Sequence, residues 1–282
     1  MGSVGDYSFI SAPPGDVAGW ASLFTPESLP VLEDTAASLD EFRGFEDATD
    51  AHLIAEIIAA DPLMSLKVLS HVGRMRRGRE GGEPETVTAA LVMLGITPFF
   101  NVFGPQPTVE AHLASRPECL EGFRLVLKRC HRAANFALGF AVQRMDHDAA
   151  VIHLAALLHD FAELLLWLRA PDLALEISRR QAADSTLRSA DVQHELLNVR
   201  LVEVQHALML SWQLPRVLVN ITDSTVHTDS AQVRNVELAI RVARHSASGW
   251  DNAALPDDFR DIGELLRLGP DPTMKLLREI DD

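Results

Sequence analysis

Apolar residues recur three or four positions apart along most of the chain, and this spacing predicts α-helices. The first example is residues 31–42, where Val31, Thr35, Leu39 and Phe42 share one helix face. The longest stripe occupies positions 123, 127, 130, 134, 138, 141 and 145. No segment alternates apolar and polar residues for long enough to predict a strand. The sequence therefore predicts an all-α protein.

Capping and breaking residues divide the helical pattern into elements. Asp61-Pro62 is typical of a helix start, because Asp caps the helix and Pro lacks an N–H at a position where none is needed. Thr86 opens another predicted helix, and Gly95 supplies its left-handed C-terminal cap. Further helices are predicted at 50–60, 172–183, 189–211 and 231–247, with one short helix at 262–268.

Residues 149–168 are apolar almost all round, which predicts the most buried helix of the protein. His153, His159, Asp160 and Glu163 interrupt this stretch. We therefore interpret it as a buried core helix and not as a membrane span.

Composition suggests four parts. Residues 1–27 are rich in Gly, Pro and Ser and are expected to form a leader that drapes over the surface or frays. Residues 28–115 form a smaller helical subdomain, and Arg116-Pro117 begins a second one at 116–248. Residues 249–282 are predicted to be a tail with a short helix.

Charge excludes several partner classes. Forty acidic and 25 basic residues give a net charge of −15, which disfavours nucleic acid and anionic membrane surfaces as partners. The basic run 74–79 is followed by acidic residues and is expected to be a solvated loop. Cys119 and Cys130 are expected to be reduced packing residues, and the N-terminus does not resemble a signal peptide, so a cytoplasmic location is predicted.

The adjacent pair His159-Asp160 is the main candidate for chemistry. On a continuous helix, these residues, His153 and Glu163 would fall within an arc of roughly 120°. His131 lies on the apolar stripe of the preceding helix and is expected to point inward. Imidazole and carboxylate together suit iron, manganese or zinc.

Structural roles are the alternative interpretation of these polar residues. A single inward histidine is usually a hydrogen-bonded core residue, and Asp160 could simply cap or bond a neighbouring backbone group. His153 is expected at the solvent edge, and Glu163 is expected to pair with an arginine.

Several short motifs, in order and spacing, resemble the HDOD domain. They are Leu29-Pro30-Val31-Leu32, Ile57-Ile58-Ala59-Ala60-Asp61-Pro62-Leu63, Leu66-Lys67-Val68-Leu69-Ser70, Ala90-Leu91-Val92-Met93-Leu94-Gly95, Ala155-Ala156-Leu157-Leu158-His159-Asp160 and Trp212-Gln213-Leu214-Pro215. The resemblance spans roughly residues 29–245. It implies a multi-helix HD-like bundle preceded by a smaller helical N-terminal subdomain, in a bacterial regulatory protein. The family is related to the HD-GYP cyclic-dinucleotide phosphodiesterases and is generally non-catalytic.

The chain departs from the family pattern at several positions. Phe161-Ala162 stands where a glycine usually follows the HD pair, and Gln205 replaces another usual glycine. Leu201 and Thr225-Val226 stand where histidines are usual, while His206 and His227 are close by but out of register. At most His131, His159 and Asp160 survive as a vestigial site, so we expect no catalytic residue and no cofactor, although a divalent metal is conceivable there.

These observations leave three functional hypotheses. The first is a non-catalytic HDOD-type regulatory module that binds signalling proteins or a small ligand and could form a homodimer. In it, His159 and Asp160 hydrogen-bond across the core and orient His131. The second is a divergent HD-type phosphohydrolase in which Glu163, His194 or Glu195 completes the metal shell. The third is a partner-docking domain with exposed apolar patches near 98–100 or Trp250.

Overall fold

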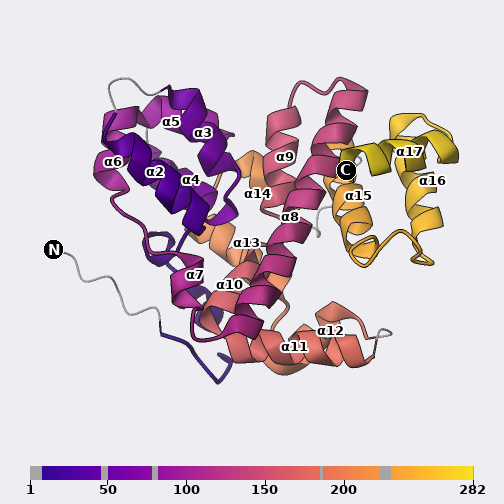
Figure 1. The fold of residues 1–282 in the computed structure, drawn as a ribbon, viewed down its shortest axis with the longest axis horizontal. Helices are drawn as coiled ribbons and strands as arrows, with labels where there is room; N and C mark the ends of the chain where they lie inside the picture. The colour runs from indigo at the N-terminus through magenta and orange to yellow at the C-terminus, as the bar shows by residue number, and fades with distance from the viewer. Residues whose placement is uncertain (1–7, 46–49, 78–81, 185–186, 223–229, 282) are drawn as a thin grey trace. The chain divides into compact units, whose positions relative to one another are not determined.

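The chain folds as an all-α protein, as the sequence predicts (Figure 1). The computed structural model describes residues 8–45, 50–77, 82–184, 187–222 and 230–281. Within these ranges the extended chain contributes only an isolated parallel bridge between Val31 and Thr108. The helices are α1 Val17–Ser22, η1 Pro26–Ser28, α2 Glu33–Arg43, α3 Ala51–Ala59, α4 Pro62–Arg76, α5 Val87–Leu94, α6 Ile96–Val102, α7 Val109–His112, α8 Pro117–Arg144, α9 Ala149–Leu157, α10 Phe161–Arg169, α11 Pro171–Ala183, α12 Ser189–Leu197, α13 Leu201–Ser211, α14 Arg216–Thr222, α15 Ala231–His245, α16 Leu255–Leu266 and α17 Pro270–Asp281.

The protein divides into two compact units that each combine separate stretches of the chain. Unit 1 contains residues 1–126 and 160–215, and unit 2 contains residues 127–159 and 216–282. This division differs from the consecutive subdomains that the sequence suggests, with boundaries after 27, 115 and 248. One of its boundaries falls inside α8 and another falls between His159 and Asp160, because long-range helix packing, and not chain order, determines the units.

The described part of the predicted leader packs into unit 1. Trp20 is 1% exposed, its indole Nε1 donates to the carbonyl of Leu197 at 2.9 Å, and α1 packs on α13. Further upstream, the amide of Ile10 donates to the carbonyl of Arg169 at 2.8 Å. Residues 8–27 are therefore part of the unit, and of the two expectations for the leader these contacts fit a segment that drapes over the surface.

The junction between α3 and α4 is organised by Asp61, as the Asp-Pro pair predicts. The Asp61 carboxylate accepts the amides of Leu63 and Met64 at 2.8 and 3.0 Å, which caps α4. Its other oxygen accepts a hydrogen bond of 2.8 Å from the amide of Leu32, the residue before α2. Burial raises the pKa of the Asp61 carboxyl, while these hydrogen bonds and one from Thr35 act in the opposite direction.

The predicted turn at Gly95 occurs, with a different backbone conformation from the one expected. Thr86 caps α5 through a hydrogen bond from the amide of Ala89, as predicted. Gly95 has φ 83° and ψ 153°, which lies outside the left-handed helical basin, in a region that is essentially restricted to glycine. The following aromatic residues are buried, Phe99 at 0% exposure and Phe100 at 3%, so these two side chains do not supply the exposed apolar patch that would favour the partner-docking hypothesis.

Two predicted helices are each broken into two. The stretch 149–168 forms α9 and α10, separated by a turn at 158–160. The stretch 189–211 forms α12 and α13, separated at Asn198, whose left-handed conformation (φ 63°) ends α12. By length and composition residues 149–169 could cross a membrane, but 72% of the most apolar window is buried inside the protein, as in a core element.

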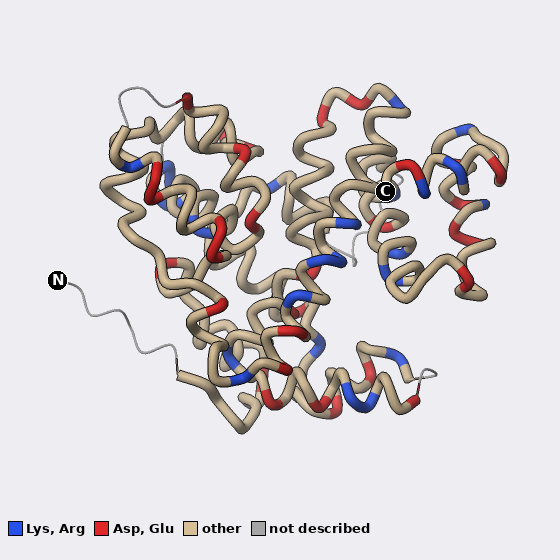
Figure 2. Tube along the Cα trace, viewed as in Figure 1, with Lys and Arg blue, Asp and Glu red and all other residues tan. Residues whose placement is uncertain are grey.

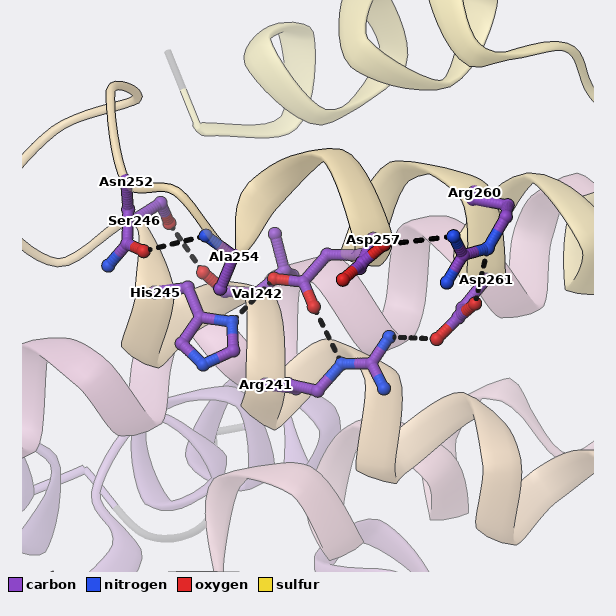
Figure 3. A network of polar contacts seen from close by, with 10 residues as sticks. Arg241, Val242, His245, Ser246, Asn252, Ala254, Asp257, Arg260 and Asp261 are labelled. Carbon is purple, nitrogen blue, oxygen red and sulfur yellow. Dashed lines mark hydrogen bonds and ion pairs between the residues drawn. The ribbon is translucent and has the colours of Figure 1, made fainter. Parts of the chain in front are cut away.

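The tail contains two helices where the sequence suggested one short helix. In unit 2, α16 packs on α15 and α17 packs on α16. Arg132 of α8 donates to both carboxylate oxygens of Asp281 near the end of α17, at 2.6 and 2.8 Å. Trp250 packs against Phe136 and Phe259, so it does not form the exposed apolar patch considered above. Figure 3 shows the polar network between α15 and α16, with Arg241 and His245 on α15 and Asp261 on α16. In this network the buried Asp258 accepts a hydrogen bond from Nδ1 of His245 at 2.7 Å and forms an ion pair with Arg241.

The long helix α8 follows the predicted stripe over most of its length. Phe123, Cys130, Ala134 and Ala141 are buried, whereas Leu138 is 37% exposed and Met145 is 84% exposed. Met145 departs from the pattern because its positive φ of 57° places it beyond the helix. Figure 2 shows that the middle of α8 carries several basic residues, although the protein as a whole is acidic.

Asp61→Asn should destabilise the protein by about 1–3 kcal/mol. Asparagine can still cap α4 through its amide oxygen, but its NH₂ group would face the amide of Leu32 and leave a buried donor unsatisfied. Urea denaturation measures the loss. Asp50→Asn is the matched control, because the exposed Asp50 caps α3 through the amide of His52. Equal losses in the two variants would contradict the proposed role of Asp61.

Two glycine substitutions in α8 should differ in cost. Alanine normally gains about 1 kcal/mol over glycine inside a helix. At Gly122, however, a Cβ would collide with the ring of Trp167, which is 4% exposed, so we expect a net loss of about 1–3 kcal/mol. At Gly139 the Cβ meets the end of the Ile280 side chain, which can rotate away, so the loss should be smaller. Thermal unfolding of the two variants checks this order, and the reverse order would refute it.

Candidate functional site

His159 and Asp160 lie in the turn between α9 and α10 and not on a continuous helix. The turn tightens after Leu157, and the amide of His159 donates to the carbonyl of Ala156 at 3.3 Å. The calculation that placed His153, His159, Asp160 and Glu163 on one helical arc is therefore wrong, because the helix ends before the pair. The unit boundary also separates the pair, with His159 in unit 2 and Asp160 in unit 1.

Asp160 begins α10, but its carboxylate does not cap that helix. The backbone carbonyl of Asp160 accepts the amides of Glu163 and Leu164 at 3.0 and 3.4 Å. Its side chain makes no capping hydrogen bond, so the interpretation of Asp160 as a simple helix cap is wrong. Asp160 has a further interaction within the protein, as His131, His159 and Glu163 also do.

A glutamine from another helix bonds to the first turn of α10. The side chain of Gln205, 4% exposed on α13, accepts the amide of Ala162 through Oε1 at 3.4 Å. Beside it, Phe161 is completely buried and stacks on Trp212, with ring centroids 5.8 Å apart. The pair Phe161-Ala162 and the residue Gln205, where the HDOD pattern usually has glycines, thus make packing and hydrogen-bonding contacts within unit 1.

The other positions of the expected site do not supply imidazole groups. Leu201 opens α13 and is 7% exposed, so an apolar side chain is buried where the family often has histidine. His206 is half-buried one position beyond Gln205 and makes interactions within the protein. Thr225, Val226 and His227 lie outside the described residues.

His131 and His153 interact within unit 2. His131 lies on α8 and His153 lies on α9, and both are half-buried. Burial lowers the pKa of His153, and the charge of His131 lowers it further. Both effects favour the neutral imidazole of His153 near pH 7.

The residues that the phosphohydrolase hypothesis adds to the shell lie on helix surfaces. His194 and Glu195 are exposed on α12, and Glu195 accepts a hydrogen bond from Arg180 of α11 at 2.8 Å. Across the described ranges, no group of three or more His, Cys, Asp or Glu side chains is arranged to hold a metal ion. The vestigial site of His131, His159 and Asp160 stays a prediction.

A second polar site was not anticipated from the sequence. Lys67 is 3% exposed in the middle of α4 and lines a cavity of about 100 Å³ in unit 1. Its signal in the sequence is a single lysine within the apolar run 62–69. Nothing in that run distinguishes a buried lysine from one whose charged end reaches solvent.

Comparisons with known proteins give both a family and a fold. The family model of the HDOD domain matches residues 29–228. The response regulator MmoQ from Methylococcus capsulatus str. Bath has a similar structure, with a TM-score of 0.66 at 20% identity over 89% of this chain and 98% of that one. A second MmoQ structure, of fragment 20–298, gives a TM-score of 0.61 at 19% identity over 86% and 95%. A virulence factor from Campylobacter jejuni subsp. jejuni gives a TM-score of 0.63 at 18% identity over 94% and 89%. The comparison with curated proteins gives no match.

Gln205→Ala should destabilise the protein by about 1–2 kcal/mol, because it leaves the buried amide of Ala162 without its acceptor. Chemical denaturation measures the change. Leu210→Ala is the control on the same helix, since Leu210 is 58% exposed and its loss should cost less than about 0.5 kcal/mol. A Gln205→Ala variant as stable as the wild type would contradict the proposed hydrogen bond.

Proposed function

Because the chain belongs to the HDOD domain family, we propose that it is a non-catalytic regulatory module of bacterial signal transduction. It acts in the cytoplasm by binding a signalling protein, or a small ligand, and without turning over a substrate. The response-regulator description of MmoQ belongs to that protein, and it agrees with a signalling role here.

The observation that carries this proposal is the packing around the HD turn. A glycine is usual within Phe161-Ala162, after the HD pair, and another is usual at Gln205. Here Phe161 stacks on Trp212, and Gln205 accepts a hydrogen bond from the amide of Ala162. Leu201 adds a buried apolar side chain at a usual histidine position. Aliphatic and aromatic side chains cannot replace imidazole as metal ligands. The surroundings of the turn therefore favour a structural role for the site.

A regulatory role requires a surface for a partner. The excess of acidic residues makes a basic or neutral protein surface a better partner than nucleic acid or an anionic membrane. A homodimer would meet the same requirement with a second copy of the chain. Mass measurement in solution by light scattering distinguishes the monomer from the dimer.

Elemental analysis of the gently purified full chain tests the proposal. We expect iron, manganese and zinc well below one equivalent, and no hydrolysis of cyclic dinucleotides or nucleotides after manganese or iron is added. Near-stoichiometric metal that disappears in His159→Ala, together with metal-dependent turnover, would overturn it in favour of the divergent phosphohydrolase. Gln205→Ala is the control, because it disturbs the turn without removing a candidate ligand.

A further inference from the structure

A small cavity lies in unit 1 between α4, the η1 turn and the segment after α6. Its volume is about 100 Å³, several times the roughly 10–15 Å³ that a cavity measured in the same way needs to hold one water molecule. Its lining includes the apolar side chains of Val102 and Phe103 and the charged side chains of Glu27, Lys67 and Arg74. The cavity therefore has room for a few non-hydrogen atoms and offers them both an apolar and a polar wall.

The polar wall is one face of α4. Lys67, His71 and Arg74 follow one another at intervals of four and three residues, which places them on the same side of the helix. Arg74 is partly exposed and forms an ion pair with Glu27. His71 contacts Phe103 edge-on, with ring centroids 5.5 Å apart. An ammonium group, a guanidinium group and an imidazole thus line the same cavity as one carboxylate.

Two of the three N–H donors of the Lys67 ammonium group bond to backbone carbonyls of the described residues. Its Nζ donates to the carbonyls of Glu27 and Leu29 at 3.1 and 2.6 Å. An ammonium group has three N–H donors, so two are accounted for. Because Lys67 is 3% exposed and lines the cavity, the remaining donor is available to an acceptor inside it.

The protein alone does not fully stabilise positive charge at this wall. Burial lowers the pKa of Lys67 to about 8, although Asp61 and Glu27 act in the opposite direction. Burial also lowers the pKa of His71, as does the charge of Arg74, while Glu27 opposes the shift. A negative charge in the cavity would favour the protonated form of both groups.

We propose that this cavity binds a short aliphatic carboxylate, with its carboxylate at Lys67 and Arg74 and its carbon chain against Val102 and Phe103. The apolar wall distinguishes this ligand from inorganic phosphate, which has no carbon chain to bury. Glu27 on the same cavity also disfavours a dianion through repulsion. The proposal goes beyond the regulatory function above and does not depend on it.

A butyrate titration of the full chain, followed by amide NMR shifts, tests the site. We expect saturable shifts at residues lining the cavity, and an affinity at least about fivefold weaker in Arg74→Gln. Arg77→Gln is the matched control, because it removes the same charge from the end of the same helix at a residue outside the cavity. Its affinity should stay within about twofold of the wild type.

The pH dependence of binding separates Lys67 from a general effect of charge. Butyrate stabilises the ammonium form and so raises the pKa of Lys67, which means that binding takes up protons near pH 8. Affinity should therefore fall as the pH rises from 7 to 9. Calorimetry in two buffers of different ionisation enthalpy measures the uptake. Lys67→Met should abolish the uptake, and if that variant does not fold, Arg74→Gln and the wild-type pH profile still decide.

Three outcomes would overturn the proposal. They are shifts that do not saturate, equal weakening by Arg74→Gln and Arg77→Gln, and saturable binding of inorganic phosphate without binding of butyrate. Because none of these outcomes involves metal content or turnover, the regulatory function would remain open in each case.

Discussion

The buried carboxylate of Asp61 is the interaction on which the N-terminal part of unit 1 depends. It accepts amides from two places far apart in the sequence, Leu32 before α2 and Leu63 and Met64 at the start of α4. Lys67, one turn further along α4, bonds the carbonyls of Glu27 and Leu29 in the same incoming segment. Burying a carboxylate is costly unless its oxygens are satisfied, so the segment before α2 and the α3–α4 junction must form together.

Much of this arrangement could be predicted from local sequence. Asp61-Pro62 and Thr86 gave the correct starts of α4 and α5, because capping depends on residues within one turn. The break at Asn198 and the turn at 158–160 could not be predicted in the same way. Both interrupt continuous apolar spacing, and the left-handed backbone of Asn198 has no strong signal in an isolated asparagine. The second tail helix could not be predicted from local spacing because its partners, α16 and residues of α8, lie elsewhere in the fold.

At the candidate site, too, motifs of neighbouring residues could be identified from the sequence, whereas contacts between separate helices could not. The resemblance identified the HD pair and the substituted positions Phe161, Leu201 and Gln205. It could not indicate that Gln205 bonds the amide of Ala162 or that Phe161 stacks on Trp212, because those partners lie on separate helices. From the sequence alone, these substitutions only remove usual histidine and glycine positions. In the structure they form contacts of their own, which explains how the turn keeps its packing without the usual residues.

The family match ends at residue 228, yet unit 2 continues to the last described residues. In that unit, α15 packs on α9 and α16, and Arg132 of α8 holds Asp281 of α17. The evolutionary unit and the folding unit therefore do not coincide. A fragment shortened to the family boundary would uncover the apolar side of α9 to water, and large exposed apolar surfaces promote aggregation. Sequence changes on the face of α15 that packs on α9 are consequently limited by the need to keep covering a helix that lies within the matched region.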